Sequence, residues 1–189
     1  MIANPPPLAV HFPREKAVDV QDAYALLLRY ACNAGAQLIF GQKVLGFEVT
    51  GGRITGVRLT DRTIAADQVV VAAGAESPKI LRELIPKHGI SMSPAALISL
   101  RADACSLAHI VDGDGLEIRS RKNGELIVAS GVEDGPEEEI KADLARDVLA
   151  RVCHLLPAVI NPRVTGVMIG QRPFLATGYP LVSSAPDVE

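Results

Sequence analysis

The stretch "VVVAAGAES", residues 69–77, decides what kind of fold this sequence encodes. Three β-branched residues in a row are typical of a strand buried on both faces, and Ser77-Pro78 is typical of a helix start. The residues between them have almost no side chain. Two explanations are open at this point. Gly74 allows a sharp turn off the strand, or a large flat group lies against the backbone and excludes bulkier side chains.

The sequence before this stretch predicts a helix, a short strand and a three-stranded meander. Asp19 is a typical cap for a helix with one apolar face, and Gly35 ends that helix. Gly51-Gly52 is a typical two-residue hairpin turn within the meander. Residues 37–40 and 69–71 do not alternate in polarity, so we expect both to be buried strands of a parallel sheet. Two short strands leave most faces uncovered, so only part of a sheet is predicted here.

The sequence after residue 90 predicts an antiparallel sheet and a long helix. Short apolar segments alternate with Gly and Asp turns, and Asn123-Gly124 is a typical hairpin turn. A helix that Pro157 ends carries its apolar positions on one face, namely Ile140, Leu144, Val148, Val152 and Leu155. Residues 163–174 predict one more strand.

Composition excludes several classes of protein. The net charge is −3 with a pI near 5.8, and no Lys/Arg stripe is present, which argues against nucleic-acid binding. No apolar run approaches the roughly 18 residues that a transmembrane helix needs. Three widely spaced cysteines, Cys32, Cys105 and Cys153, are typical of reduced thiols in the cytoplasm. The histidines stand apart, so no metal site is predicted, and no glycine-rich segment has the spacing and the following helix that bind a pyrophosphate.

Three segments in this order resemble one family of flavoproteins. They are "NAGAQLIFGQKVLGFEVTGGRITGVRLT" (33–60), "IAADQVVVAAGAESPKIL" (64–81) and "GQRPFLATGYPLV" (170–182). The resemblance is to the family of D-amino acid oxidase, glycine oxidase and sarcosine oxidase, within it to the amino-acid and opine oxidase or dehydrogenase branch. It covers about residues 8–183.

The resemblance implies a fold of class α/β plus α+β in three sequence domains. Residues 1–90 would be a partial FAD-binding Rossmann-like domain with a β-meander and parallel strands. Residues 91–170 would be an antiparallel substrate-binding domain with a long helix, and residues 171–189 would start the return to the FAD domain. The family's N-terminal GxGxxG unit and its flavin-closing C-terminal segment have no counterpart here. We therefore expect a truncated gene product, a cloned fragment or one piece of a split enzyme.

The resemblance also implies how FAD would be bound. Val44 matches the valine whose backbone meets the adenine of FAD, although its side chain also suits a core position. Ala72, Ala73 and Gly74 match a small-residue turn that passes close to the cofactor. The complete protein is expected to bind FAD, whereas the chain alone is expected neither to retain FAD nor to be active. Its uncovered strand edges would favour a homodimer or a missing complementary chain.

For the substrate, Arg172 in "GQRP" matches the arginine that grips the carboxylate of an amino acid, a role that suits a guanidinium. A surface arginine is the alternative. Glu117 and Arg119 fall on the strand expected beside the substrate, on one face, and a solvated face is again the alternative. The aspartate that many members carry after this arginine is absent from "TGYP" (177–180), which leaves substrate identity open.

The implied activity is oxidation of a C–N bond in an amino acid or opine-like amine carboxylate, by hydride transfer to flavin. No catalytic residue is assigned, since direct hydride transfer needs no general base. The alternative is a non-catalytic binding or assembly module derived from the substrate domain of such a flavoprotein.

Overall fold

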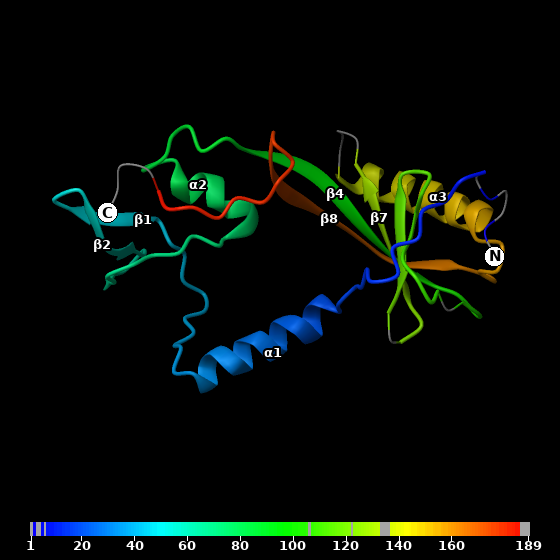
Figure 1. Cartoon of the computed structure of the whole chain (residues 1–189), viewed down its shortest axis with the longest axis horizontal. Helices are drawn as coiled ribbons and strands as arrows, with labels where there is room; N and C mark the ends of the chain where they lie inside the picture. The colour runs from blue at the N-terminus through cyan, green and yellow to red at the C-terminus, as the bar shows by residue number, and fades with distance from the viewer. Residues whose placement is uncertain are drawn as a thin grey trace. The chain divides into compact units, whose positions relative to one another are not determined.

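The computed structural model describes residues 2, 5, 7–105, 107–121, 123–132 and 137–185, whose elements are labelled in Figure 1. The chain divides into two compact units. The first comprises Met1–Ala31 and Pro94–Gly170, and the second comprises Cys32–Ser93 and Gln171–Glu189. In the described residues, no helix is both long and apolar enough to cross a membrane.

The first unit is built on a five-stranded sheet in the order β5-β6-β7-β4-β8. Its strands are β4 (Ile90–Arg101), β5 (Val111–Gly113), β6 (Leu116–Ser120), β7 (Leu126–Gly131) and β8 (Arg163–Leu175). The β4–β7, β5–β6 and β6–β7 pairs are antiparallel, which confirms the predicted antiparallel sheet. The predicted hairpin turn between β6 and β7 is also confirmed. The Arg121 amide donates to the Glu125 carbonyl at 2.7 Å, and Gly124 has a φ of 78°.

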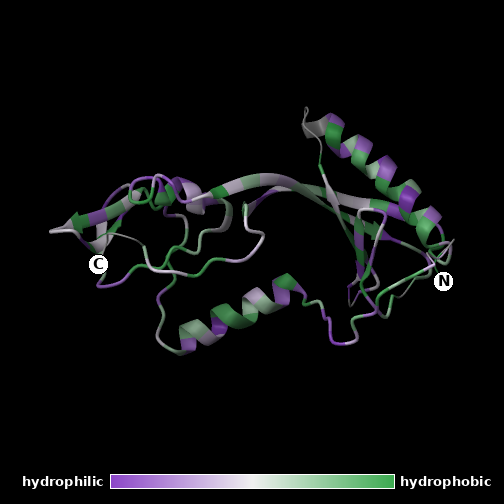
Figure 2. Ribbon diagram, turned by 45° about the horizontal axis from the view of Figure 1, so that its top comes forward, coloured by the Kyte–Doolittle hydropathy of each residue, from purple (hydrophilic) through white to green (hydrophobic). Residues whose placement is uncertain are grey.

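One face of this sheet forms the main hydrophobic core. Ile98, Val128 and Ile118 stand opposite one another on three neighbouring strands, and all are fully buried. The helix α3 (Glu137–Leu155) covers them through Val148 and Val152, as its predicted apolar face requires. Apolar and polar residues alternate along α3 in Figure 2. Each fully buried side chain of this kind contributes roughly 1.5–3 kcal/mol relative to an exposed one.

Arg151 connects α3 to the turn between β5 and β6. Its guanidinium pairs with Asp147 on α3 at 3.0 Å and with the Asp114 carboxylate in the turn at 3.3 Å, and it also donates to the Asp114 carbonyl. The hydrogen bond with Asp147 is the main cause that raises the pKa of Arg151. Asp114 has a φ of 51°, a conformation that aspartate tolerates better than most residues.

The second unit contains the predicted meander and a short helix. The meander is an antiparallel sheet of β1 (Gly46–Thr50), β2 (Arg53–Arg58) and β3 (Thr63–Ala65). Gly51 and Gly52 have φ angles of 58° and 84°, as a tight hairpin turn of this type needs. After residues 72–73 the chain forms a 3₁₀ turn, η1 (Gly74–Glu76), and then α2 (Ser77–Leu81), which confirms the predicted helix start.

Helix α1 (Val20–Asn33) forms where the sequence predicts it. The Asp19 carboxylate accepts hydrogen bonds from the amides of Gln21 at 3.0 Å and Asp22 at 3.4 Å, and Gly35 follows the helix with a φ of 94°. The apolar face of α1 is not buried by the described residues. Tyr24, Leu27 and Tyr30 are all exposed.

The two predicted parallel strands are not found. Neither residues 37–40 nor residues 69–71 form strands in the described chain. Phe40 is 72% exposed and Val70 is 87% exposed. A strand exists only when a neighbouring backbone takes up its N–H and C=O groups, and no described strand pairs with either segment. The prediction of two buried strands is therefore wrong for the structure described here, because none of the described residues covers these apolar segments or pairs with their backbone.

Neighbouring residues of β4 give a direct test of which sheet face is the core. We expect Ile98→Ala to lower the free energy of unfolding by about 2–5 kcal/mol, because it leaves a cavity beneath α3. Leu97 lies on the opposite face and is 42% exposed, whereas Ile98 is 0% exposed. Leu97→Ala should therefore lower the free energy of unfolding by roughly half as much as Ile98→Ala, or by less. Urea unfolding followed by circular dichroism measures both, and equal losses would contradict this assignment.

Candidate cofactor and substrate sites

The small-residue bend, residues 72–74, is open on the side where a side chain would project. Gly74 has a φ of 53°, and a Cβ built on it would meet no heavy atom within 4 Å. Ala72 and Ala73 are exposed, and the Glu76 amide donates to the Ala73 carbonyl at 3.0 Å, which begins η1. Because the φ of Gly74 is positive, the geometry of the turn is enough to explain a glycine at this position. The described side chains leave the bend unfilled, so its backbone also fits close approach by a flat cofactor.

Val44 lies just before β1 and is half-buried. The next residue, Leu45, extends the meander, since its amide donates to the Arg58 carbonyl at 2.8 Å. This bond fixes the backbone around Val44 relative to β2. The half-buried side chain of Val44 is not part of the hydrophobic core, and the contact of its backbone with FAD stays a prediction.

An ion pair that sequence reasoning missed links the meander to the segment that follows α2. Arg58 on β2 pairs with both carboxylate oxygens of Glu83, at 3.0 and 3.1 Å, and also donates to the Phe47 carbonyl on β1. The pair packs over Gly46, where an added Cβ would lie 2.3 Å from Glu83. These contacts hold α2, and through it the bend, against the meander. Only the lack of a side chain at Gly46 could have indicated this close approach.

Arg172 lies on β8 in the second unit, and its side chain is exposed. Within the described part of the chain it forms no ion pair. Gly170 and Pro173 beside it are exposed as well. A guanidinium without a carboxylate partner retains all its N–H donors for another anion. This availability suits the predicted role in binding a carboxylate, which remains a prediction.

Glu117 and Arg119 lie on β6 in the first unit, on the sheet face that α3 does not cover. Leu116 and Ile118 point into the core, so the residues between and after them face the other way. The Arg119 guanidinium lies 3.4 Å from the Glu117 carboxylate. The structure thus brings these two residues together, while Val44, the bend and Arg172 belong to the second unit.

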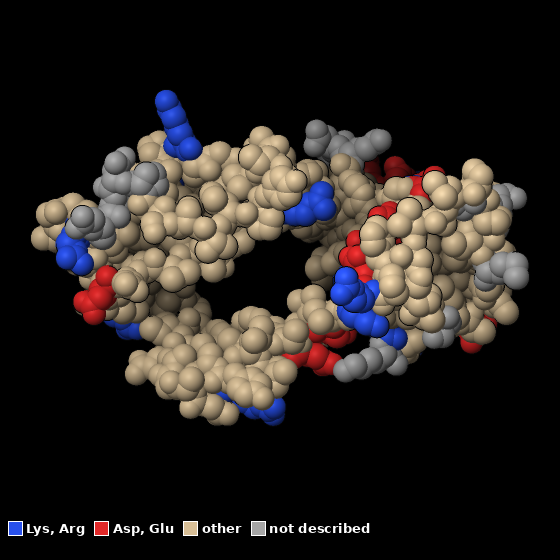
Figure 3. All heavy atoms as spheres, viewed as in Figure 1, with Lys and Arg blue, Asp and Glu red and all other residues tan. Residues whose placement is uncertain are grey.

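Other reactive groups form no cluster. No group of three or more His, Cys, Asp or Glu side chains in the described residues could hold a metal ion. All three cysteines are free thiols, and burial raises the pKa of Cys105. Lys and Arg side chains stand singly or in small groups on the face shown in Figure 3.

Comparison with known proteins gives the family. The DAO family, described as FAD dependent oxidoreductase, matches residues 4–189. The chain therefore belongs to the DAO family of FAD-dependent oxidoreductases.

Individual relatives agree with this assignment. A glycine oxidase of Pseudomonas putida is 30% identical over 130 residues, which are 68% of this chain and 36% of that protein. An uncharacterized oxidoreductase of Bacillus subtilis is 27% identical over 134 residues, again 68% of this chain and 36% of that protein. The chain thus spans little more than a third of the curated relatives it matches.

Solved structures show the same fold. Iminodiacetate oxidase from Chelativorans sp. BNC1 matches with a TM-score of 0.75 at 22% identity, over 88% of this chain and 46% of that chain. Glycine oxidase from Bacillus cereus matches with a TM-score of 0.68 at 18% identity, over 85% of this chain and 45% of that chain. These likenesses confirm the mixed α/β fold class with antiparallel sheets. The family implies FAD for the complete protein.

Two glycines of the meander test how tightly the second unit is packed. A Cβ on Gly56 would lie 2.4 Å from the backbone carbonyl oxygen of Ile64, so β3 would have to move. We expect Gly56→Ala to destabilise the meander by about 1–3 kcal/mol. Gly46→Ala should cost less than about 1 kcal/mol, because it displaces only the exposed Arg58–Glu83 pair. Hydrogen exchange of the β1–β3 amides measures both effects, and a larger loss at Gly46 would be the contrary result.

Proposed function

We propose that the complete protein containing this chain oxidises the C–N bond of an amino acid or an opine-like amine carboxylate. Family membership supports an FAD-dependent oxidoreductase of the amino-acid oxidase type. The observation that carries the finer assignment is Arg172, an exposed arginine on β8 within the sequence "GQRP" that forms no ion pair with any described residue. A guanidinium binds a carboxylate through two parallel hydrogen bonds, which orient the substrate as well as hold it.

The second unit is proposed to hold part of the cofactor. Val44 would contact the adenine through its backbone. Ala72, Ala73 and Gly74 have little or no side chain and would let the cofactor lie against their backbone. Bound FAD would supply the hydride acceptor for oxidation at the carbon next to the amine. The protein's own contribution is then to bind the carboxylate at Arg172 and to fix the orientation of that carbon. No general base of this chain is assigned to the reaction.

Glycine oxidase of Pseudomonas putida acts on glycine, as its name states. A small amine carboxylate is accordingly the proposed substrate, with the exact compound left to experiment. A cytoplasmic location, and assembly as a homodimer or with a complementary chain, remain predictions from the sequence.

Substitution of Arg172 tests the proposed function in the complete flavoprotein. We expect Arg172→Ala to raise the Michaelis constant for an amino-acid substrate more than about tenfold, because the carboxylate loses its paired donors. Arg163→Ala is the matched control, since Arg163 lies on the same strand and forms only a long, exposed pair with Asp103 at 3.6 Å. Steady-state kinetics of substrate oxidation give the Michaelis constant of both variants.

Unchanged kinetics in Arg172→Ala would rule out its role. A complete protein that binds no flavin and oxidises no amine carboxylate would favour the alternative, a non-catalytic binding or assembly module.

A further inference from the structure

The turn between β6 and β7 carries the only asparagine of the sequence that precedes a glycine. Of the other asparagines, Asn4 and Asn161 precede proline, and Asn33 precedes alanine. The backbone nitrogen of the following residue can attack an asparagine side chain and close a succinimide ring. Proline has no N–H to give up, and the methyl group of alanine hinders the attack, whereas glycine has neither obstacle. The sequence therefore makes Asn123 the asparagine that is most open to this chemistry.

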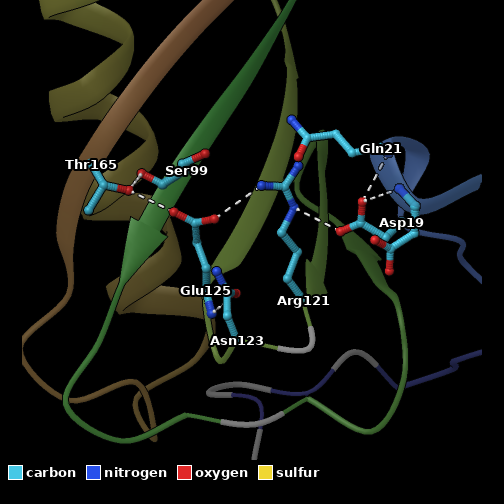
Figure 4. A network of polar contacts seen from close by, with 8 residues as sticks. Asp19, Gln21, Ser99, Arg121, Asn123, Glu125 and Thr165 are labelled. Carbon is cyan, nitrogen blue, oxygen red and sulfur yellow. Dashed lines mark hydrogen bonds and ion pairs between the residues drawn. The ribbon is translucent and has the colours of Figure 1, made fainter. Parts of the chain in front are cut away.

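The structure holds the Asn123 side chain over the backbone that follows it. Both Asn123 and Gly124 are exposed, so water reaches them. The Glu125 amide donates to Oδ1 of Asn123 at 3.0 Å, as Figure 4 shows. The ring of atoms that this hydrogen bond closes includes the Gly124 nitrogen. The side-chain carbonyl carbon of Asn123 therefore stays close to the nitrogen that would attack it.

The same hydrogen bond favours the attack itself. Attack on the carbonyl carbon of Asn123 places negative charge on Oδ1, and the Glu125 N–H already points at this oxygen. A donor that is in place before the reaction stabilises the developing charge without rearrangement.

One contact opposes the attack. The Gly124 amide donates to the Arg121 carbonyl at 3.1 Å, and this bond must open before the nitrogen can lose its proton. A single backbone hydrogen bond in an exposed turn opens readily by local fluctuation. It therefore slows the reaction without preventing it.

We propose that Asn123 is a site of spontaneous deamidation in the folded protein. The Gly124 nitrogen gives its proton to water and bonds to the side-chain carbonyl carbon, and the side-chain nitrogen leaves as ammonia. Water then opens the succinimide at one of its two carbonyls. One opening leaves an ordinary aspartate, and the other leaves an isoaspartate, whose main chain runs through Cβ. The reaction needs neither FAD nor an amine substrate, so it is independent of the proposed function.

The modified turn lies next to a network that joins three elements, shown in Figure 4. Glu125 pairs with Arg121 at 3.1 Å and accepts a hydrogen bond from the Thr165 hydroxyl on β8, also at 3.1 Å. Arg121 in turn lies 3.6 Å from the carboxylate of Asp19, the cap of α1. The start of α1 is therefore attached to the sheet through the two residues that flank this turn.

The two products would affect this network differently. Both add a carboxylate close to Arg121, which already has two. Isoaspartate also adds one atom to the main chain between Arg121 and Glu125, whose backbones are joined at 2.7 Å. The longer turn no longer fits this pairing. We therefore expect isoaspartate, and not aspartate, to weaken the pair of Arg121 with Asp19 and to loosen the start of α1.

Ageing of the 189-residue chain in mildly alkaline buffer tests the site. Peptide mass mapping follows the conversion of amide to acid, and enzymatic methylation of isoaspartate identifies that product. We expect residue 123 to convert at least about tenfold faster than Asn33, the internal reference. Asn123→Gln is the matched control, since its longer side chain would have to close a larger ring, and it should stay unmodified at this position.

The same chain unfolded in urea shows whether the fold permits the reaction. Conversion in urea with no conversion in the folded chain would overturn the proposal, since the turn would then protect Asn123. Hydrogen exchange of α1 tests the consequence. Exchange in the first turn of α1 should be faster in the isoaspartate form than in Asn123→Asp, which adds the same charge without the extra main-chain atom. Equal exchange in the two would refute the coupling to α1.

Discussion

Burial of one face of the five-stranded sheet beneath α3 is the constraint on which the first unit depends. Ile98, Val128 and Ile118 can all reach this core only in one register, because a shift by one residue would turn each of them to the other face. The same register fixes which residues face away from the core. It is the reason why Glu117 and Arg119 lie together and why Arg121 meets the cap of α1.

Weaker interactions hold the second unit together. Its meander is held by its own backbone ladder and by the Arg58–Glu83 pair over Gly46. Its strongly apolar segments, residues 37–40 and 69–71, lie outside any described sheet. An exposed apolar surface of this kind is costly in water and typical of a surface that another polypeptide covers.

Local chemistry made most elements predictable from the sequence. The Asp19 cap, the Gly51-Gly52 turn, the Asn123-Gly124 turn and the apolar face of α3 each depend on nearby residues, and all four are found. Residues 69–71 were wrongly expected to form a strand, because strand formation depends on a distant partner that local composition cannot supply. The Arg58–Glu83 pair joins residues 25 positions apart, which no periodicity indicates. The ion pair of Arg121 with Asp19 likewise joins residues that are far apart in the sequence.

Hydrogen–deuterium exchange of the 189-residue chain tests the central claim, that residues 37–40 and 69–71 are not covered by the described part of the chain. Amides of β4, β6 and β7 should exchange slowly, because they are paired within a buried sheet. Amides of residues 37–40 and 69–71 should exchange at nearly the rate of an unstructured peptide. Slow exchange of residues 69–71, as slow as that of β6, would contradict the account, since it would place these valines in a completed sheet.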